Sequence, residues 1–263
     1  MSGSQTPVPR QALLELVDVH KRFGGVAALR GVSFSVLAGV VLGLIGPNGS
    51  GKSTCVNVIS GLLAPTSGVV RFLGETTAGI GVNRMVERGL ARTFQTTSVF
   101  AEFTAMENVQ AASHTRFGVG ALAAVLGGGA TGREEAEMRE RGTQLLSLVG
   151  LDGAADVVAA SLSSAQQRLL MIANALATEP RLLLLDEPAA GMVASERKAL
   201  AALILRIRDR GIGVLVIEHH MALIMEVCDR IVVLNFGEKI AQGASAEVGR
   251  DPRVIEAYLG QAH

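Results

Sequence analysis

The chain has 263 residues, and 49% of them are hydrophobic, which is enough for one large domain or for a core with a smaller subdomain. Its 24 Lys and Arg balance its 24 Asp and Glu, and it has 8 Phe, one Tyr and no Trp, which argues against a nucleic-acid partner held by bulk charge or base stacking. No apolar run reaches the roughly 18 residues of a membrane span, and MSGSQTPVPRQ at the start has no apolar signal region, so we expect a cytoplasmic chain that reaches a membrane only through partners.

The first part of the chain predicts a tail followed by strands. Residues 1–10 are polar and contain proline, so we expect a flexible tail. From Leu13 to about Val41, the alternating stretches LLELVDV and GVSFSV predict strands of an antiparallel sheet. VVLGLI at 40–45 is apolar throughout, which is typical of a strand buried on both faces.

Two similar apolar runs occur later, RLLLLD at 181–186 and GVLVIEH at 213–219. A helical stretch at 196–210 lies between them. This alternation of strand and helix predicts a parallel α/β sheet. Cys55 and Cys228 lie in apolar surroundings, so we expect buried, reduced thiols.

The pattern of hydrophobic residues changes between about 96 and 165, where strand signals are weak and we expect a helical subdomain. REEAEMRERGTQLLSLVG at 133–150 predicts a charged amphipathic helix with a solvated face. GVGALAAVLGGGATG at 118–132 is too short to span a bilayer, and it is either a loop or a surface near a membrane partner. LSSAQQRLLMIANAL at 162–176 predicts a core helix capped by Ser163, whose N-terminus could also hold an anion.

The strongest motif is GPNGSGKST, which follows the buried strand at 40–45 and precedes a helix. Its glycines let the backbone curl so that N–H groups point inward, where they and the helix dipole can hold phosphates. Lys52 adds a charge at the β- and γ-phosphates, and the Ser53 hydroxyl can ligate Mg²⁺. The predicted ATP-binding residues of this loop are Gly46, Pro47, Asn48, Gly49, Ser50, Gly51, Lys52, Ser53 and Thr54.

Three further groups of residues are candidates for nucleotide hydrolysis when they are considered together with this loop. Asp186 and Glu187 follow a buried strand at the edge where α/β sheets bind ligands, so Asp186 can hold Mg²⁺ through water and Glu187 can orient or deprotonate an attacking water. His219 follows the neighbouring predicted strand and is a candidate for contact with the γ-phosphate. Gln95, at the entry to the helical block, is a candidate Mg²⁺ ligand and sensor. The predicted catalytic residues are Glu187, His219, Gln95 and Lys52, and the predicted metal ligands are Ser53, Gln95 and Asp186.

These parts together resemble the ATP-binding subunits of ABC transporters, from about Leu13 to Gly260. GPNGSGKST resembles the Walker A motif, LLLLDEP the Walker B motif, Gln95 the Q-loop and His219 the switch histidine. LSSAQ (162–166) falls at the LSGGQ-type signature, and Phe23 matches the aromatic residue that stacks on adenine. KRFGGVAAL, ARTFQ, MENV, DEPAAG, IEHHM and VIEAYLG resemble the branched-chain amino-acid uptake group, to which urea and amide importers are close relatives.

The resemblance implies an α/β fold: a P-loop NTPase core with a mixed, largely parallel sheet, an N-terminal antiparallel β-subdomain and an inserted helical subdomain. We expect the core over 11–95 and 166–245, the helical subdomain with the signature over 96–165, and a C-terminal tail helix over 246–263. The implied function is the import of branched-chain amino acids, driven by Mg²⁺-dependent ATP hydrolysis, with import of urea, amides or another small polar solute as the alternative. The implied partners are a second ATPase subunit, transmembrane permease subunits at the cytoplasmic face of the membrane and, indirectly, a solute-binding protein.

Three positions depart from the family pattern. Ala165 stands where the signature has Gly, AAGMVA places Val193 where the loop after Walker B is polar, and His220 stands where Asp usually follows the switch histidine. In the family, two subunits dimerise head to tail, so Ser163 would touch the partner's ATP. Because the altered Ala165 and Val193 would face that ATP while the groups for the chain's own ATP are intact, we expect a heterodimer, with a homodimer as the alternative.

Two other interpretations of these departures stay open. Ala165 could simply be tolerated, or the chain could be a regulatory ATP-binding module with weak hydrolysis. An ABC-type ATPase acting away from membranes is disfavoured by the neutral charge and by the lack of a tandem ATPase domain or a long coiled-coil insertion.

Overall fold

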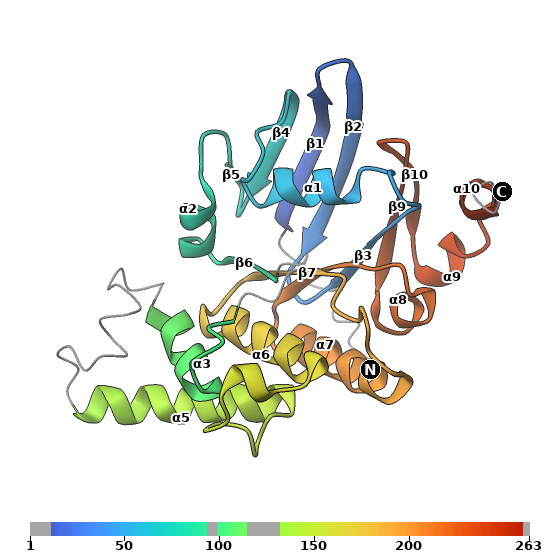
Figure 1. Cartoon of the computed structure of the whole chain (residues 1–263). Helices are drawn as coiled ribbons and strands as arrows, with labels where there is room; N and C mark the ends of the chain where they lie inside the picture. Colours follow the sequence, from blue (N-terminus) through green and yellow to red (C-terminus); the bar gives the residue numbers. More distant parts are fainter. Residues whose placement is uncertain (1–11, 94–98, 115–131, 260–263) are drawn as a thin grey trace, which may run out of the picture.

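The computed structural model describes residues 12–93, 99–114 and 132–259, which form two sheets and a helical layer (Figure 1). The smaller sheet is antiparallel, with strand order β2-β1-β4-β5. Its strands are β1 (Ala12–Phe23), β2 (Val26–Leu37), β4 (Ser67–Phe72) and β5 (Glu75–Thr76). The antiparallel N-terminal strands predicted from the alternating pattern are therefore confirmed.

The larger sheet has six strands in the order β10-β9-β3-β8-β7-β6. All neighbouring pairs are parallel except β9 with β10. The strands are β3 (Val41–Ile45), β6 (Leu90–Thr93), β7 (Leu182–Asp186), β8 (Gly213–Ile217), β9 (Arg230–Asn235) and β10 (Glu238–Gly243). Every residue of β3, β7 and β8 is buried, as their continuous apolar runs predict, because the sheet is covered on both faces.

Helices cover the larger sheet and extend from it. Their bounds are α1 (Lys52–Ile59), α2 (Val82–Glu87), α3 (Ala105–His114), α5 (Gly132–Val149), a 3₁₀ turn (Ala159–Ser161), α6 (Ser164–Ala177), α7 (Ala194–Asp209), α8 (Met221–Val227), α9 (Ser245–Val248) and α10 (Pro252–Leu259). None of the helices in the described ranges is long and apolar enough to cross a membrane.

Alternate residues of the buried strands divide the core into two hydrophobic clusters. In β3, Val41 and Ile45 belong to the cluster beneath α6, α7 and α8, whereas Leu42 and Leu44 belong to the cluster shared with α1 and the antiparallel sheet. This is the period-two alternation of strand side chains, here with both faces apolar. The loop that follows β3 therefore starts from a strand that is packed on both faces.

The helical layer consists of α3, α5 and α6, which pack against one another below the larger sheet (Figure 1). α5 confirms the charged helix predicted at 133–150, and α7 confirms the helix predicted at 196–210. Because α6 contacts both this layer and β6, the division at residue 165 stays a prediction.

The fold class is confirmed, but the single tail helix predicted over 246–263 is wrong for the part that the structure describes. Two short helices, α9 and α10, replace it. Pro252 has no N–H and is the first residue of α10, and the Asp251 carboxylate accepts a hydrogen bond from the Arg253 N–H at 2.9 Å. A new helix therefore begins there instead of a continuation of α9.

Both cysteines are free and buried, as expected.

Candidate nucleotide-binding site

The loop between β3 and α1 is curled by glycines in conformations that other residues rarely adopt. Gly49 has φ +77° and Gly51 has φ +102°. A Cβ on Gly51 would lie 2.6 Å from the Ala28 carbonyl oxygen, so the loop packs against β2 only because this side chain is missing. A Cβ on Gly49 would meet no described atom within 4 Å, so this side of the loop faces open space.

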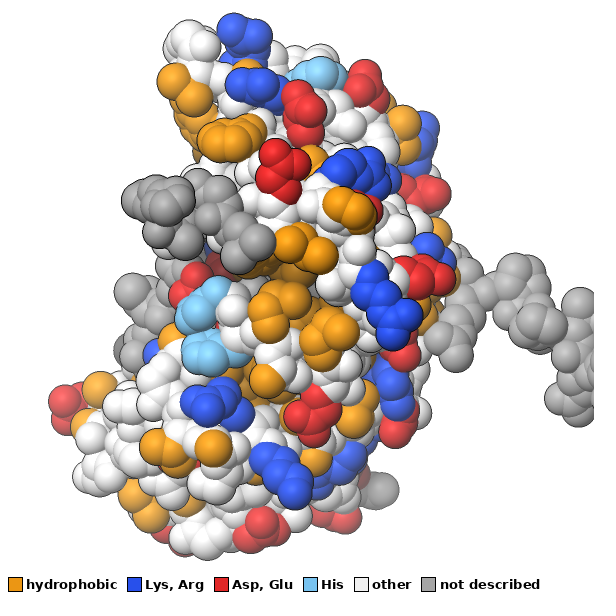
Figure 2. Space-filling model, turned by 90° about the vertical axis from the view of Figure 1, so that its right-hand side faces the viewer, with side chains coloured by type: hydrophobic (Ala, Val, Ile, Leu, Met, Phe, Trp, Pro, Cys, Tyr) orange, Lys and Arg blue, Asp and Glu red, His pale blue; other side chains and the backbone are white. Residues whose placement is uncertain are grey.

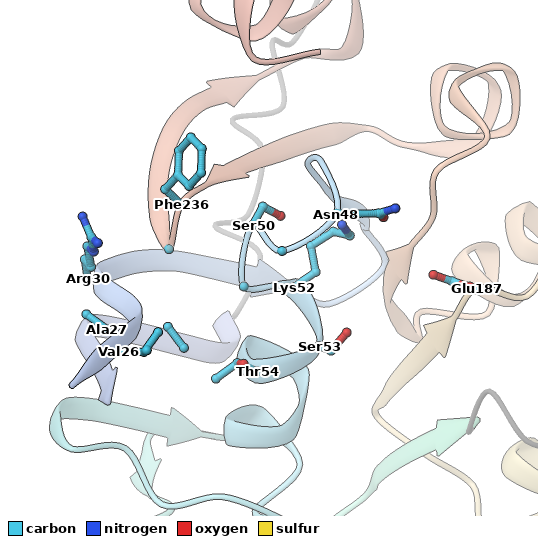
Figure 3. A pocket seen from close by; sticks show the side chains of 14 residues that line it. Val26, Ala27, Arg30, Asn48, Ser50, Lys52, Ser53, Thr54, Glu187 and Phe236 are labelled. Carbon is cyan, nitrogen blue, oxygen red and sulfur yellow. The ribbon is translucent and has the colours of Figure 1, made fainter. Parts of the chain in front are cut away.

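The loop forms one wall of a cavity of about 390 Å³ (Figure 3). Figure 3 shows Lys52 and Ser53 on the loop and first turn of α1, with Glu187 across from them at the end of β7. The residues that line the cavity are Val26, Ala27, Ala28, Arg30, Asn48, Gly49, Ser50, Gly51, Lys52, Ser53, Thr54, Glu187, Phe236 and Gly237. The structure thus brings most of the predicted loop residues and Glu187 to a single cavity.

Lys52 is partly buried, and its ammonium is held by the loop itself. Its Nζ donates hydrogen bonds to the carbonyl oxygens of Gly46 at 2.7 Å and Pro47 at 2.9 Å. Burial lowers the pKa of Lys52, and the nearby Glu187 and Asp186 carboxylates oppose this change. A partly desolvated cation on a glycine-rich loop at the start of a helix is a suitable group for binding phosphate.

Asp186 is buried at the end of β7 and is paired with an arginine that sequence reasoning missed as a site residue. The Arg92 Nη2 lies 2.8 Å from the Asp186 Oδ2, and the two side chains are 9% and 3% exposed. The other terminal nitrogen of Arg92 donates to the Asn57 Oδ1 on α1 at 2.8 Å and to the Oγ of Ser60, the C-cap residue of α1, at 3.2 Å. Arg92 therefore ties the end of β7 to the helix that follows the phosphate loop.

Glu187 leaves β7 in a left-handed conformation, with φ +49°. Its N–H donates to the Ile217 carbonyl oxygen at 2.9 Å, which fixes this turn to the end of β8. Because a non-glycine residue with positive φ is uncommon, this geometry marks a position that the surrounding structure determines strongly. It aims the Glu187 side chain at the cavity.

His219 follows β8, the strand beside β7, so the predicted neighbourhood of the two strand ends is confirmed. Its side chain is 56% exposed and lies outside the described cavity lining. The buried Glu218 orders this turn: its Oε2 accepts from the N–H groups of His219 at 3.0 Å and His220 at 3.2 Å, and its Oε1 accepts from the Ala189 N–H at 2.8 Å. A carboxyl directly after an apolar strand was the available signal for Glu218, and sequence reasoning did not use it.

Phe23 and Phe236 are two exposed aromatic residues near the cavity. Phe23, at the end of β1, is 48% exposed with the Lys21 ammonium 5.2 Å from its ring centre, and it lies outside the described lining. Phe236, with φ +45°, stands at the rim beside Arg30 (Figure 3). The adenine-stacking role of Phe23 stays a prediction, and Phe236 was not predicted.

Ser163 caps α6, as predicted. Its Oγ accepts from the Gln166 N–H at 3.3 Å, and the Gln166 Oε1 accepts from the Ser163 N–H at 3.0 Å, which forms a capping box. Ser163 is exposed and lies outside the described cavity lining, whereas Ala165 packs partly against the core. Gln95 lies outside the described residues, so its predicted role stays a prediction.

The donors around the cavity fit a nucleoside triphosphate with a divalent cation. Loop amides and Lys52 would hold the phosphates, and the exposed Ser53 hydroxyl is an oxygen ligand of the kind that Mg²⁺ prefers. The Asp186 carboxylate is buried and lies outside the described lining, so it would act on the cation through water. When bound, Mg²⁺ would neutralise charge on the terminal phosphates. Acidic and basic side chains are interspersed on the face shown in Figure 2, without a broad area of positive charge.

Comparisons with known proteins agree with this geometry. The family model for ABC transporters matches residues 29–190, and a model for branched-chain amino acid ATP-binding cassette transporters matches residues 238–263. The high-affinity branched-chain amino acid transport ATP-binding protein BraF of Pseudomonas aeruginosa is 40% identical over 251 residues, covering 95% of this chain and 98% of the relative.

Solved structures show the same fold. The ADP conformation of the ATP-binding cassette MJ1267 is 31% identical with a TM-score of 0.81, covering 95% of this chain and 100% of that one. A dimeric post-hydrolysis state of the cassette MJ0796, bound to ADP and phosphate, is 26% identical with a TM-score of 0.73, covering 88% and 98%.

Proposed function

The chain belongs to the ABC transporter family, and from that premise we propose that it binds and hydrolyses ATP to drive the import of branched-chain amino acids. The observation that carries the proposal is the cavity in which the curled loop and Lys52 face Glu187. Two curated relatives support the solute class, because BraF and the Escherichia coli LivG, 36% identical over 253 residues, are both named as branched-chain amino acid transport proteins. Import of urea, amides or another small polar solute is the alternative within the same mechanism.

The residues of this chain divide the work of hydrolysis. Lys52 and the loop amides bind the β- and γ-phosphates, and Ser53, Gln95 and, through water, Asp186 would hold Mg²⁺. Glu187 orients a water for in-line attack on the γ-phosphorus and accepts its proton, while the bond from that phosphorus to the β-phosphate oxygen breaks and ADP leaves. General-base catalysis supplies about 10²- to 10⁴-fold in rate. His219 contacts the γ-phosphate.

The decisive experiment compares binding with turnover. Glu187→Gln should keep nucleotide affinity and reduce Mg²⁺-dependent hydrolysis by the assembled transporter about 10- to 100-fold, because the slower ATP site of the partner keeps turning over. The matched control is Glu226→Gln on α8, an exposed carboxylate away from this cavity. Full hydrolysis by Glu187→Gln would refute the assignment. A wild-type transporter that binds ATP without hydrolysing it would instead support the regulatory module.

The chain acts at the cytoplasmic face of the membrane through transmembrane permease subunits, and a solute-binding protein delivers the substrate to them. Uptake of labelled leucine, isoleucine and valine into vesicles that contain the reconstituted transporter, compared with urea, tests the solute. ATP-dependent uptake of urea alone would overturn the branched-chain assignment and leave the ATPase assignment in place.

The second ATPase subunit is a different chain, and the two ATP sites turn over unequally. The groups that face the chain's own ATP are intact, whereas Ala165 and Val193, which would face the partner's ATP, are altered. Losing a charge-assisted hydrogen bond of about 1.5–3 kcal/mol in the transition state slows hydrolysis about ten- to a hundredfold. Glu187→Gln here should therefore remove more turnover than the same change in the partner, and equal effects would reject the asymmetry.

A further inference from the structure

The turn after β8 places two histidines next to a buried carboxylate. The Glu218 side chain is 0% exposed, and its Oε2 lies 3.1 Å from the His220 Nδ1 and 3.8 Å from the His219 Nδ1. The centroids of the two imidazole rings are 4.3 Å apart. Two adjoining histidine side chains are visible at the surface in Figure 2. The cluster thus combines a buried anion with two imidazoles that solvent can reach.

The spacing of these three side chains fits a metal ion. One nitrogen of each imidazole and one Glu218 oxygen all lie within 4.8 Å of one another. Zn²⁺ binds imidazole nitrogens and carboxylate oxygens at about 2.0–2.1 Å in a tetrahedron, so its ligand atoms lie roughly 3.3–3.4 Å from one another. The two distances from the Glu218 oxygen, 3.1 Å and 3.8 Å, are close to this value. Small rotations of the partly exposed rings would complete the geometry.

The charge of Glu218 favours a bound cation. Among the residues that the structure describes, the ion pairs of this buried carboxylate involve only His219 and His220. Backbone N–H groups of Ala189, His219 and His220 donate to its two oxygens and hold it in place. A hydrogen-bonded carboxylate is a ligand whose orientation is fixed in advance, and a cation beside it offsets the cost of burying its charge.

His220 gives the ion a route from solvent. Its side chain is 34% exposed and lines a second cavity, of about 470 Å³, whose other lining residues come from α7 and α8. Arg197 and Lys198 line this cavity as well, and their charges oppose a cation. With three protein ligands and these opposing charges, we expect a Kd for Zn²⁺ on the order of a micromolar, weaker than in structural sites with four ligands.

His220 also determines which metal the cluster selects. The resemblance to ABC transporter subunits places Asp at this position, and this chain has His. An imidazole supplies nitrogen in place of oxygen, which suits Zn²⁺, whereas Mg²⁺ prefers oxygen ligands. The cluster should therefore bind Zn²⁺ in the presence of the Mg²⁺ that accompanies ATP.

We propose that Glu218, His219 and His220 form a Zn²⁺ site that inhibits ATP hydrolysis. The bound ion would engage the His219 imidazole, which could then no longer contact the γ-phosphate. Water would take the fourth position of the ion. Zn²⁺ binding follows from the geometry of the three side chains, whereas the inhibition rests on the proposed function of His219.

Calorimetric titration of the full chain, purified without a histidine tag, tests Zn²⁺ binding. An excess of Mg²⁺ keeps sites with oxygen ligands, such as the one at Ser53, from contributing. The first variant is His220→Asn, because His220 is the N-cap residue of α8 and Asn is favourable there. It should weaken Zn²⁺ binding at least about tenfold, the lower end of the cost of losing a group that only supports a ligand. His219→Asn should weaken it to a similar extent.

His20→Asn is the matched control. The His20 Nε2 lies 3.1 Å from the Asp18 Oδ1, so this histidine also contacts a carboxylate. The pair has one imidazole instead of two, and its carboxylate is 75% exposed. His20→Asn should therefore bind Zn²⁺ as wild type does.

The second experiment measures ATP hydrolysis by the assembled transporter with excess Mg²⁺ and ATP. Zn²⁺ at micromolar concentration should inhibit the wild type, and a chelator added in an amount equal to the Zn²⁺ should restore its rate. The transporter with His220→Asn should be inhibited at least about tenfold less sensitively, relative to its own rate without Zn²⁺.

The outcomes separate the metal site, its regulatory role and the proposed function. The metal site is wrong if wild type binds no Zn²⁺, or if either asparagine variant at 219 or 220 binds it as tightly as wild type. Zn²⁺ binding with equal inhibition of the wild type and His220→Asn would overturn the regulatory role alone. A transporter that hydrolyses no ATP would overturn the proposed function, and the calorimetry would still decide the metal site.

Discussion

Replacing Arg92 by methionine tests whether the buried pair with Asp186 holds the catalytic edge of the sheet. The pair is 2.8 Å long, with side-chain exposures of 9% and 3%. Methionine keeps much of the apolar volume of the arginine stem and removes the charge. Asp186 would then be a buried carboxylate without its cationic partner.

Removal of one partner of a buried pair destabilises a protein by about 3–5 kcal/mol, because the remaining charge stays desolvated. For a chain of this size each kcal/mol lowers the unfolding temperature by about 2–4 °C, so Arg92→Met should lower it by roughly 6–20 °C. An exposed pair provides the scale for comparison: Arg141 and Glu179 lie 3.1 Å apart but are 68% and 58% exposed. Arg141→Met should lower stability by less than about 1 kcal/mol.

Urea unfolding followed by circular dichroism measures both variants. The second test is a double-mutant cycle with Asp186→Asn, because removal of the second charge should restore part of the stability lost in Arg92→Met. If Arg92→Met and Arg141→Met lose equal stability, or if Asp186→Asn adds its full effect in the Arg92→Met background, the pair does not stabilise the edge as argued.

Three further predictions concern the loop, the helix cap and the thiols. Gly46→Ala should reduce nucleotide affinity and stability more than Gly49→Ala in calorimetry and thermal unfolding, because its Cβ would lie 2.1 Å from a β9 carbonyl oxygen while the other meets no described atom within 4 Å. Ser163→Ala should lower the free energy of unfolding by about 1 kcal/mol through loss of the cap, and no change would argue against the capping box. Burial raises the pKa of Cys55 and Cys228 to about 12, so both thiols should stay protonated and should not react with a thiol reagent at pH 8 until the chain unfolds. The free energy of unfolding should fall as the pH rises above about 9, because the thiols of the unfolded chain ionise first. Rapid labelling of the native protein would contradict this prediction.

The fold was predictable where one strand or helix carries its own pattern. The apolar runs that became β3, β7 and β8 are short, continuous and separated by helices, so their burial on both faces follows from composition alone. β6 (LART) could not be recognised in this way, because only pairing with β7 makes it a strand. β9 was missed as well, although it forms the neighbour of β3.

The same distinction applies to the site. The phosphate loop is local, so its glycines, Lys52 and Ser53 can be read from consecutive residues. Arg92 meets Asp186 across 94 residues of sequence, so no local pattern reveals this contact. A site residue of this kind can be identified only when the order of the strands in the sheet is known.

The structure around Val193 bears on the proposed asymmetry of the two ATP sites. Val193 is the N-cap residue of α7, 60% of its surface is exposed, and its side chain has no oxygen to cap the helix. The Glu196 carboxylate accepts the Val193 N–H at 2.9 Å, so the start of α7 has a carboxylate hydrogen bond that does not depend on the side chain at 193. The exposed Val193 side chain therefore contributes little to the stability of its own chain. Its substitution would instead change the contact with a partner that covers this surface. In the proposed head-to-tail dimer this surface would face the partner's ATP site, so the proposed asymmetry has to be measured in the assembled pair.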